Sequence, residues 1–354
     1  MTERDEAAPG GATPDWLDGG IDEWEFCWER LVEVSRTFSR PIDMLPGTLR
    51  VTVTCGYLLC RVADTVEDHP ELPIERRDDL YEGFLEVVER GEDPERFTRP
   101  FSDIPGSGPE HELSENLEQV MAIFERLPEE VQRVCTRWIG EMTRGMQLYS
   151  HRPADDHGLV SVDSLADLER YCYYVAGTVG HMLTGLFLYE FDELADERRH
   201  AMRADSESFG LGLQLVNIVK DQTDDLGRSR RFIPTRLIER AGLQPDDLYE
   251  PANRQQAHAV IEPIIERASD HLDDALEYTL AIPPERRQTR LFCLLPLWMA
   301  VRTLAHARGN DAMFIPEQPV KISRTEVESL IGNCVQNATN DEALRDQYEA
   351  LKAE

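Results

Sequence analysis

The chain has 354 residues, with 68 Asp and Glu against 37 Lys and Arg, and a formal net charge of −31. Nucleic-acid phosphates and anionic lipids attract basic faces, so this balance excludes a general nucleic-acid binder and a polybasic membrane anchor. A composition that is 41% hydrophobic and 8% aromatic is too apolar for a disordered acidic chain. Because concentrated salt screens surface repulsion, the composition predicts a salt-adapted cytoplasmic protein.

Apolar residues recur at helical spacing from the end of an acidic N-terminal tail (1–20) to a polar C-terminal tail (341–354). Pro/Gly/Asp-rich loops are expected at 91–110 and 151–162, and Ser161 or Asp163 can cap the helix that follows. The expected helices cover residues 22–37, 47–69, 74–90, 112–126, 128–150, 163–190, 196–226, 246–280, 284–308 and 323–338. The pattern predicts a single all-α domain over residues 21–340.

No targeting or membrane segment is expected from the sequence. The N-terminus has no apolar core, and the C-terminus is too polar for a tail anchor. The most apolar run, Leu291 to Val301, is shorter than the roughly 20 residues that a membrane helix needs. The seven cysteines form no CxxC pair, which predicts reduced core thiols rather than a zinc site or a disulfide framework.

Three stretches are apolar on most of the helix circumference: residues 51–63, 171–189 and 209–219. Helices of this kind are buried in a core or line an apolar cavity. Small residues interrupt two of them, namely Ala176, Gly177, Gly180, Gly210 and Gly212. Two interpretations are open at this point: close helix packing, or room for a ligand against the backbone.

Two acidic clusters follow directly on apolar helices. The first contains Asp64, Glu67 and Asp68, and the second contains Asp221, Asp224 and Asp225. Side chains three or four residues apart share a helix face, where a divalent cation would offset their repulsion. Chance alone gives about 13 acidic pairs four residues apart in so acidic a chain. The surroundings of these two clusters are less common than the acidic pairs themselves, because Arg61, Lys220 and the run Arg228–Arg231 interrupt the acidic background. The clusters indicate either a metal–diphosphate site or a surface ion-pair network.

Four segments in this order resemble the squalene/phytoene synthase family: SRTF (35–38), YLLCRVADTVED (57–68), YCYYVAGTVG (171–180) and LQLVNIVKDQTDD (213–225). The resemblance extends through GRSRRFIP (227–234), FCLLP (292–296) and VKI (320–322), and covers roughly residues 25 to 325. The DTVED sequence is similar to the first acidic motif in the squalene branch of the family. The YCYYVAGTVG sequence is similar to a segment also found in phytoene synthases.

The resemblance implies an all-α isoprenoid-synthase bundle with a central apolar cavity. It also implies two aspartate-rich motifs that face each other and hold Mg²⁺ and prenyl diphosphates. The implied metal ligands are Asp64, Glu67, Asp68, Asp221, Asp224 and Asp225. The implied substrate-binding residues are Ser35, Arg36, Phe38, Arg50, Arg61, Gln214, Asn217, Lys220, Arg230 and Lys321. The implied catalytic residues are Tyr57, Tyr171 and Phe292, and either tyrosine could handle a proton.

Without the resemblance, most of these residues have an ordinary structural interpretation. Tyr57, Tyr171 and Phe292 would be core aromatics, and Gln214 and Asn217 would be interior hydrogen-bonding residues. Ser35 and Arg36 would end a helix, and Lys321 would be an exposed lysine. The chain also departs from the family pattern at two positions. His69 stands where many relatives carry an acid, and Lys220 stands where arginine is frequent, which keeps the charge and loses the bidentate fork.

The implied reaction joins two farnesyl diphosphates head to head through presqualene diphosphate, after which NADPH reduces the product to squalene. The chain has no GxGxxG fingerprint before a strand–helix unit, so NADPH is implied by the resemblance alone. The alternatives are phytoene formation from two geranylgeranyl diphosphates without reduction, and a reaction that stops at hydroxysqualene or presqualene diphosphate. A non-enzymatic acidic helical scaffold that binds divalent ions is also open, as are the oligomeric state and transient membrane contact.

Overall fold

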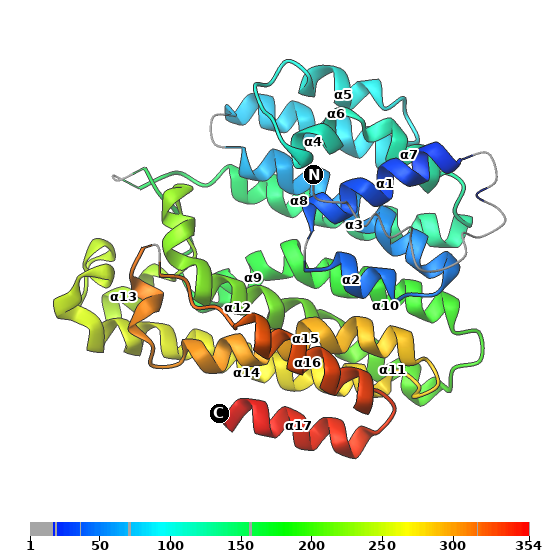
Figure 1. Cartoon of the computed structure of the whole chain (residues 1–354). Coiled ribbons are helices and arrows are strands. Elements are labelled where there is room, and N and C mark those ends of the chain that lie inside the picture. Colours follow the sequence, from blue (N-terminus) through cyan, green and yellow to red (C-terminus); the bar gives the residue numbers. More distant parts are fainter. Residues whose placement is uncertain are drawn as a thin grey trace, which may run out of the picture. The chain divides into compact units, whose positions relative to one another are not determined.

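The computed structural model describes residue 17 and residues 20–35, 37–69, 72–155, 158–316 and 318–353. Helices dominate this part of the chain, and the only strands found in it are two of two residues each (Figure 1). The predicted all-α fold class is therefore confirmed. Most of the predicted N-terminal tail lies outside the described residues. None of the described helices is long and apolar enough to span a bilayer.

The first of two compact units comprises Met1–Gly140 and Gly185–Glu193. Its helices are α1 (Ile21–Val34), α2 (Ser39–Asp43), α3 (Gly47–Asp68), α4 (Ile74–Arg90), α5 (Glu95–Phe101), α6 (Pro109–Glu115), α7 (Leu117–Phe124), the first part of α8 (Glu129–Ser150) and the last part of α10 (Thr178–Glu190). Helix α3 packs against α1, α4, α6 and α7, and most of its residues are buried. It is therefore the central helix of this unit.

The second unit comprises Glu141–Thr184 and Leu194–Glu354. It contains β1 (Val160–Ser161), α9 (Leu165–Cys172), the π-helical turn η2 (Tyr173–Gly177), α10 (Thr178–Glu190, up to Thr184), α11 (Asp196–Ala204), α12 (Ser206–Gly227), β2 (Arg230–Arg231), α13 (Thr235–Arg240), the 3₁₀ turns η3 (Pro245–Tyr249), η4 (Pro251–Asn253) and η5 (Asp311–Phe314), α14 (Arg254–Ala281), α15 (Arg287–Ala307), α16 (Arg324–Asn337) and α17 (Asp341–Ala353). Helices α12, α14 and α15 lie side by side (Figure 1). The two strands pair in parallel, with Val160 opposite Arg230.

The small residues of the second unit serve close helix packing. A Cβ on Gly180 would lie 2.0 Å from the backbone oxygen of Ser206, and one on Gly210 would lie 2.1 Å from that of Ala176. The π-helical turn and α10 therefore touch α12 backbone to backbone, and only glycine fits at these two positions. Of the two interpretations left open by the sequence, close packing is confirmed for Gly180 and Gly210.

The predicted C-terminal tail is instead a helix. Leu344 and Tyr348 of α17 are buried, and the helix packs against α15. Arg290 of α15 is fully buried and pairs with Asp341 at the start of α17 at 2.6 Å. It also donates to backbone oxygens at the ends of α14 and α16, so one side chain joins the termini of three helices. The tail prediction was wrong because two apolar residues at i and i+4 suffice to dock a polar helix.

The predicted loop at 91–110 also contains a helix. Phe97 and Phe101 of α5 are one turn apart, and Phe97 packs on Phe84 of α4 with ring centroids 5.7 Å apart. Phe101 stacks on Phe97 in turn, and both rings are buried, which stabilises a short helix in a Pro-rich segment. Other predicted helices are interrupted rather than absent, since 163–190 contains the π-helical turn and 196–226 breaks at Asp205. The N-cap of α9 is Ser164 and not Ser161 or Asp163.

All seven cysteines lie in the described residues, and all are buried and free of disulfides. Burial raises the pKa of Cys27, Cys55 and Cys135 in the first unit, so these thiols stay protonated at neutral pH. The prediction of core thiols is confirmed. The predicted limits of a single domain, residues 21–340, stay a prediction.

Candidate functional site

One stripe of α3 carries five of the predicted site residues: Arg50, Tyr57, Arg61, Asp64 and Asp68. Each residue turns a helix by about 100°, so these positions fall within about 40° of one line along it. Glu67 lies about 100° from that line and is buried, with 5% of its surface exposed. The stripe therefore brings Asp64 and Asp68 together one turn apart, and it leaves the third predicted metal ligand on another side of the helix.

Arg61 joins the aromatic and acidic parts of this stripe. Its Nη2 donates to the hydroxyl oxygen of Tyr57 at 3.0 Å, and its Nη1 lies 3.4 Å from Asp64 Oδ2. Its guanidinium also lies over the Tyr57 ring, 5.7 Å from the centroid. Burial alone would lower the pKa of Arg61, but Asp64, Tyr57 and Asp68 outweigh burial and raise it. Arg61 thus stays charged, and its guanidinium is held by Tyr57 before it and Asp64 after it on the helix.

The segment before α3 adds two more predicted residues to this group. The Phe38 ring lies 5.9 Å from the Tyr57 ring, and the Phe38 amide donates to Ser35 Oγ at 3.1 Å. Ser35 is buried, and its hydroxyl fixes the turn that carries Phe38. Arg36 lies outside the described residues. The structure therefore brings Ser35, Phe38, Tyr57, Arg61 and Asp64 into one chain of contacts within the first unit.

Arg50 is the most deeply buried predicted cation of the stripe. Its side chain is 1% exposed, and its Nη1 lies 3.4 Å from Asp43 Oδ1. The guanidinium also lies 5.9 Å from the Trp28 ring centroid. Buried charges need such compensation, because removal from water costs several kcal/mol. Arg50 therefore contributes to the packing of α1, α2 and α3, which the sequence does not predict.

The second acidic motif lies on a stripe of α12 that carries Gln214, Asn217, Asp221 and Asp225. Gln214, Asp221 and Asp225 are half-buried, whereas Asn217 and Asp224 are exposed. Lys220 starts about 100° from this stripe, but its ammonium reaches around the helix and contacts Asp221 Oδ2. The second unit therefore repeats the arrangement of the first, with a cation next to the acid that begins the motif.

A sharp turn at the end of α12 sets the position of Arg230. Ser229 has a positive φ of 61°, which is uncommon for a residue other than glycine. Its backbone oxygen accepts a hydrogen bond from the Val160 amide at 3.0 Å. Successive strand side chains point to opposite faces, so Arg230 and Arg231 diverge. Pairing with β1 thus holds the backbone at Arg230, which follows Asp225 by five residues in the sequence.

Arg231 is a residue that sequence reasoning did not single out as a site residue. It is 2% exposed, and it forms ion pairs with Asp155 at 3.3 Å and with Asp246 at 3.7 Å. Its charge is thus balanced by the protein itself. The arginine run after the second motif therefore divides into the exposed Arg228, the half-buried Arg230 and the structural Arg231.

Tyr171 lies in an aromatic cluster near these strands. Its ring stacks on Phe232 at a centroid distance of 4.6 Å and meets the Tyr149 ring edge-on at 5.2 Å. Phe232 directly follows β2, so the cluster adjoins the segment that carries Arg230. Phe292 is buried in α15, and Lys321 is exposed just before α16. Tyr149 and Phe232 were not predicted as site residues, although Phe232 lies within the family-like segment 227–234.

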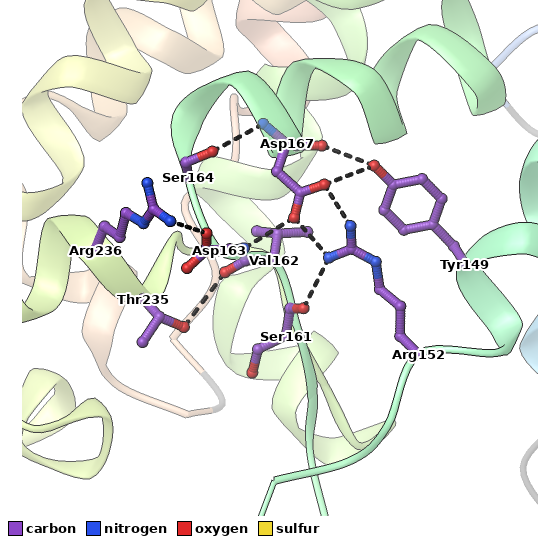
Figure 2. A network of polar contacts seen from close by, with 9 residues as sticks. All are labelled: Tyr149, Arg152, Ser161, Val162, Asp163, Ser164, Asp167, Thr235 and Arg236. Atoms are coloured by element: carbon purple, nitrogen blue, oxygen red, sulfur yellow. Dashed lines mark hydrogen bonds and ion pairs between the residues drawn. The ribbon is translucent and has the colours of Figure 1, made fainter.

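A polar network next to this cluster was also missed. Tyr149, Arg152 and Asp167 form its centre, and Figure 2 shows them around the start of α9. The signal that could have found it is the S-x-x-D pattern of Ser164 and Asp167, which is typical of a helix start. Ser164 accepts a hydrogen bond from the Asp167 amide at 3.3 Å, as that pattern predicts.

The donor chemistry of the two stripes fits magnesium. Mg²⁺ binds through one or two carboxylates and completes its shell with water and substrate phosphates. Each stripe offers two carboxylates one turn apart, Asp64 with Asp68 and Asp221 with Asp225. Over the described residues, no three or more His, Cys, Asp or Glu side chains are grouped to hold a metal ion. Two carboxylates leave most of the Mg²⁺ shell to water and phosphate oxygens, so each pair fits an ion that is shared with a diphosphate.

The fold and its two acidic helices define a helical protein of the isoprenoid-synthase type. A solved structure of TcSQS in complex with a ligand is similar to this chain, with a TM-score of 0.77 and 27% identity. The match covers 94% of this chain and 92% of that one. The model of the squalene/phytoene synthase family matches residues 31–326. The chain belongs to this family.

Curated relatives point to one branch of the family. The squalene synthase of Schizosaccharomyces pombe is 30% identical over 305 residues, which cover 86% of this chain and 64% of that protein. The squalene synthase of Saccharomyces cerevisiae is 31% identical over 287 residues, which cover 80% of this chain and 61% of that protein. The chain therefore spans a little under two thirds of the length of these relatives.

Proposed function

We propose that this protein is a squalene synthase, a prenyltransferase that condenses two farnesyl diphosphates through presqualene diphosphate and reduces the product with NADPH. The observation that carries the proposal is the repeated arrangement of a cation beside a carboxylate pair on α3 and on α12, in a member of this family. Relatives named squalene synthase favour this branch over phytoene synthesis.

The carboxylates proposed to hold Mg²⁺ are Asp64 and Asp68 on α3, and Asp221 and Asp225 on α12. When bound, Mg²⁺ acts as a Lewis acid that neutralises a diphosphate leaving group. Glu67 and Asp224 are proposed to support these pairs from outside the stripes. Gln214 and Asn217 share the α12 stripe with the second pair, where amides can donate to diphosphate oxygens.

Arg61 and Lys220 are proposed to receive the diphosphates. Each cation pairs with a carboxylate that Mg²⁺ would recruit, so metal binding would free it for a phosphate oxygen. Fixed cations lower the barrier most where negative charge develops, and ionisation of an allylic diphosphate creates such charge on the leaving group. Arg230, held by β2, and Lys321 are proposed as further diphosphate contacts.

Tyr57, Tyr171 and Phe292 are proposed to stabilise the carbocation that ionisation leaves. Aromatic faces attract cations, with about 0.5–2 kcal/mol for each ring. Tyr57 accepts a hydrogen bond from Arg61, so its own hydroxyl hydrogen is free to be directed at a neighbouring group. Either Tyr57 or Tyr171 is proposed to take part in proton transfer.

The setting of the reaction is also a proposal. The acidic composition supports a cytoplasmic enzyme that works in concentrated salt, with transient membrane contact for its hydrocarbon product. The measurement is turnover at increasing KCl. Activity that rises toward molar salt supports salt adaptation, and activity that peaks in dilute buffer contradicts it.

A competition between substrates tests the branch. Purified protein with Mg²⁺ and NADPH is given farnesyl and geranylgeranyl diphosphate together, and the products are separated by chain length. The proposal predicts squalene as the main product. Phytoene as the main product would overturn the squalene branch, and no product from either substrate would favour the non-enzymatic scaffold.

A further inference from the structure

The aromatic cluster of the second unit is tied to a polar network that none of the predicted roles uses. Arg152 contacts both carboxylate oxygens of Asp167, and its Nη1 lies 2.5 Å from Oδ2 (Figure 2). The same nitrogen donates to the backbone oxygen of Ser161 at 3.2 Å. The Asp163 amide donates to Asp167 Oδ2 at 2.9 Å. The carboxylate of Asp167 is therefore fixed by several donors and is only 12% exposed at its side chain.

Tyr149 connects this network to Tyr171. Its hydroxyl lies 2.9 Å from both Oδ1 and the backbone oxygen of Asp167, and Arg152 lies over its ring at 4.3 Å from the centroid. The Tyr149 ring meets the Tyr171 ring edge-on. Asp167 and Tyr171 are four residues apart on α9 and share one helix face. Tyr149 thus spans one turn of α9, with its hydroxyl on Asp167 and its ring on Tyr171.

The direction of the Tyr149 hydrogen bond is fixed by the charges around it. Burial raises the pKa of Tyr149, and the hydrogen bond to Asp167 raises it further, so the hydroxyl keeps its proton and donates. Burial alone would raise the pKa of Asp167, but the hydrogen bonds from Arg152, the Asp163 amide and Tyr149 lower it on balance. Asp167 stays ionised and accepts throughout the neutral range.

The Tyr171 ring has a second support, the Phe232 ring. Phe232 stacks on Tyr171 with an interplanar angle of 23° and directly follows β2. Strand β2 pairs with β1, whose Ser161 is the residue that accepts from Arg152. Arg152 and Asp167 therefore anchor both supports of the Tyr171 ring, one through Tyr149 and the other through the paired strands.

We propose that Asp167, held by Arg152, is a positioning residue that fixes the ring of Tyr171 through Tyr149. This inference rests on the proposed function, in which Tyr171 faces the carbocation. A ring that is free to tilt would stabilise the cation less well and admit water. Loss of the network should therefore lower kcat and divert product toward hydroxysqualene, while KM stays nearly constant because backbone hydrogen bonds still pair the strands that hold Arg230.

The test compares Asp167→Asn and Tyr149→Phe with the matched control Asp163→Asn. Asp163 lies in the same segment and pairs with Arg236 at 2.7 Å, but both side chains are more than half exposed (Figure 2). The expected result is a kcat about tenfold lower for Asp167→Asn, with KM within about twofold, because small misplacements at a reacting centre are costly. Tyr149→Phe keeps the ring and should lose about threefold. The control should stay within about twofold of the wild type in both constants.

A second readout does not depend on activity. The protein has ten tyrosines, so fluorotyrosine labelling gives a small set of ¹⁹F signals, and Tyr171→Phe identifies the signal of Tyr171. That signal should shift in Asp167→Asn and Tyr149→Phe and stay in place in Asp163→Asn. An unmoved signal, or a kcat for Asp167→Asn equal to that of the control, overturns the positioning role. A wild-type protein without turnover overturns the proposed function instead, and the ¹⁹F signal still decides the positioning.

Discussion

The two acidic helices hold their cations in different ways. On α3, Arg61 lies between Tyr57 and Asp64, two partners one turn to either side on the same helix. On α12, Lys220 has the side chain of its direct neighbour Asp221 as its contact. The helices are also held differently, since α12 touches the π-helical turn and α10 through glycines. The comparison indicates that the first motif depends on side-chain geometry and the second on backbone fit.

Loss of one carboxylate from either motif should have the largest effect. Asp64→Asn and Asp221→Asn each remove a proposed metal ligand, and each should lower kcat at least about a hundredfold, since even outer-shell changes at metal sites cost about 10- to 100-fold. Turnover at saturating Mg²⁺ is the measurement. If both motifs serve one reaction, the double variant should be little worse than either single variant, because groups that act as a unit are not additive.

Removal of the metal gives the matching control. Chelation by EDTA should abolish turnover in the wild type, and added Mg²⁺ should restore it. Turnover that persists in EDTA, or in either Asn variant, would contradict the role of the carboxylate pairs as metal ligands. The comparison of α3 with α12 as two metal-binding motifs would then have no basis.

Alanine at the crossing glycines should destabilise the second unit. A Cβ at position 180 or 210 would lie about 2 Å from a backbone oxygen, so the helices must separate, at a cost of about 1–3 kcal/mol. Gly332 on α16 has open space around it, and alanine there should raise the free energy of unfolding by about 0.5–1 kcal/mol. Chemical denaturation measures both. Equal effects of Gly210→Ala and Gly332→Ala would refute the close crossing.

Exchange of the two cations should sharpen the contrast between the motifs. Arg61→Lys loses the planar fork that reaches Tyr57 and Asp64 together, and kcat should fall about tenfold, equivalent to about 1.4 kcal/mol. Lys220→Arg keeps the charge at a site with one contact, and the loss should be about threefold or less. A larger loss for Lys220→Arg than for Arg61→Lys would show that the second motif also depends on side-chain geometry.

A carboxylate on α16 shows how hydrogen bonds lower a pKa. Hydrogen bonds from the Ser323 backbone, His306 and the Ser323 hydroxyl lower the pKa of Glu326 from 4.5 to about 2. The folded-state pKa is depressed, so the stability that Glu326 contributes is present above about pH 4.5 and is lost as the pH falls toward 2. Thermal unfolding between pH 5 and about 2 should show this loss. Glu326→Gln should remove that part of the pH dependence, and an unchanged profile would contradict it.

Much of the site could be predicted from the helical spacing of residues in the sequence. The contacts of Arg61 follow from residues three and four positions away, so the first motif could be predicted as a group. The spacing also places Asp221 and Asp225 on one face of α12. Glu67 shows the limit, because proximity in sequence made it a ligand candidate although it lies off the stripe and is buried.

Contacts between distant segments could not be predicted in the same way. The partners of Arg231 are 76 and 15 residues away, and alternation along a two-residue strand decides that Arg231 rather than Arg230 is buried. Helix α17 likewise depends on distant contacts with α15, where Asp341 pairs with Arg290 and the Tyr348 ring packs on Trp298. Such placements depend on loop geometry, for which one sequence has no periodic signal.

The most direct test of the central claim is the product formed from farnesyl diphosphate and Mg²⁺ with and without NADPH. We expect presqualene diphosphate, or products of its solvolysis, to accumulate without NADPH and squalene to replace it when NADPH is added. A product mixture that NADPH does not change would contradict the assignment to the squalene branch, even if the two carboxylate pairs proved essential.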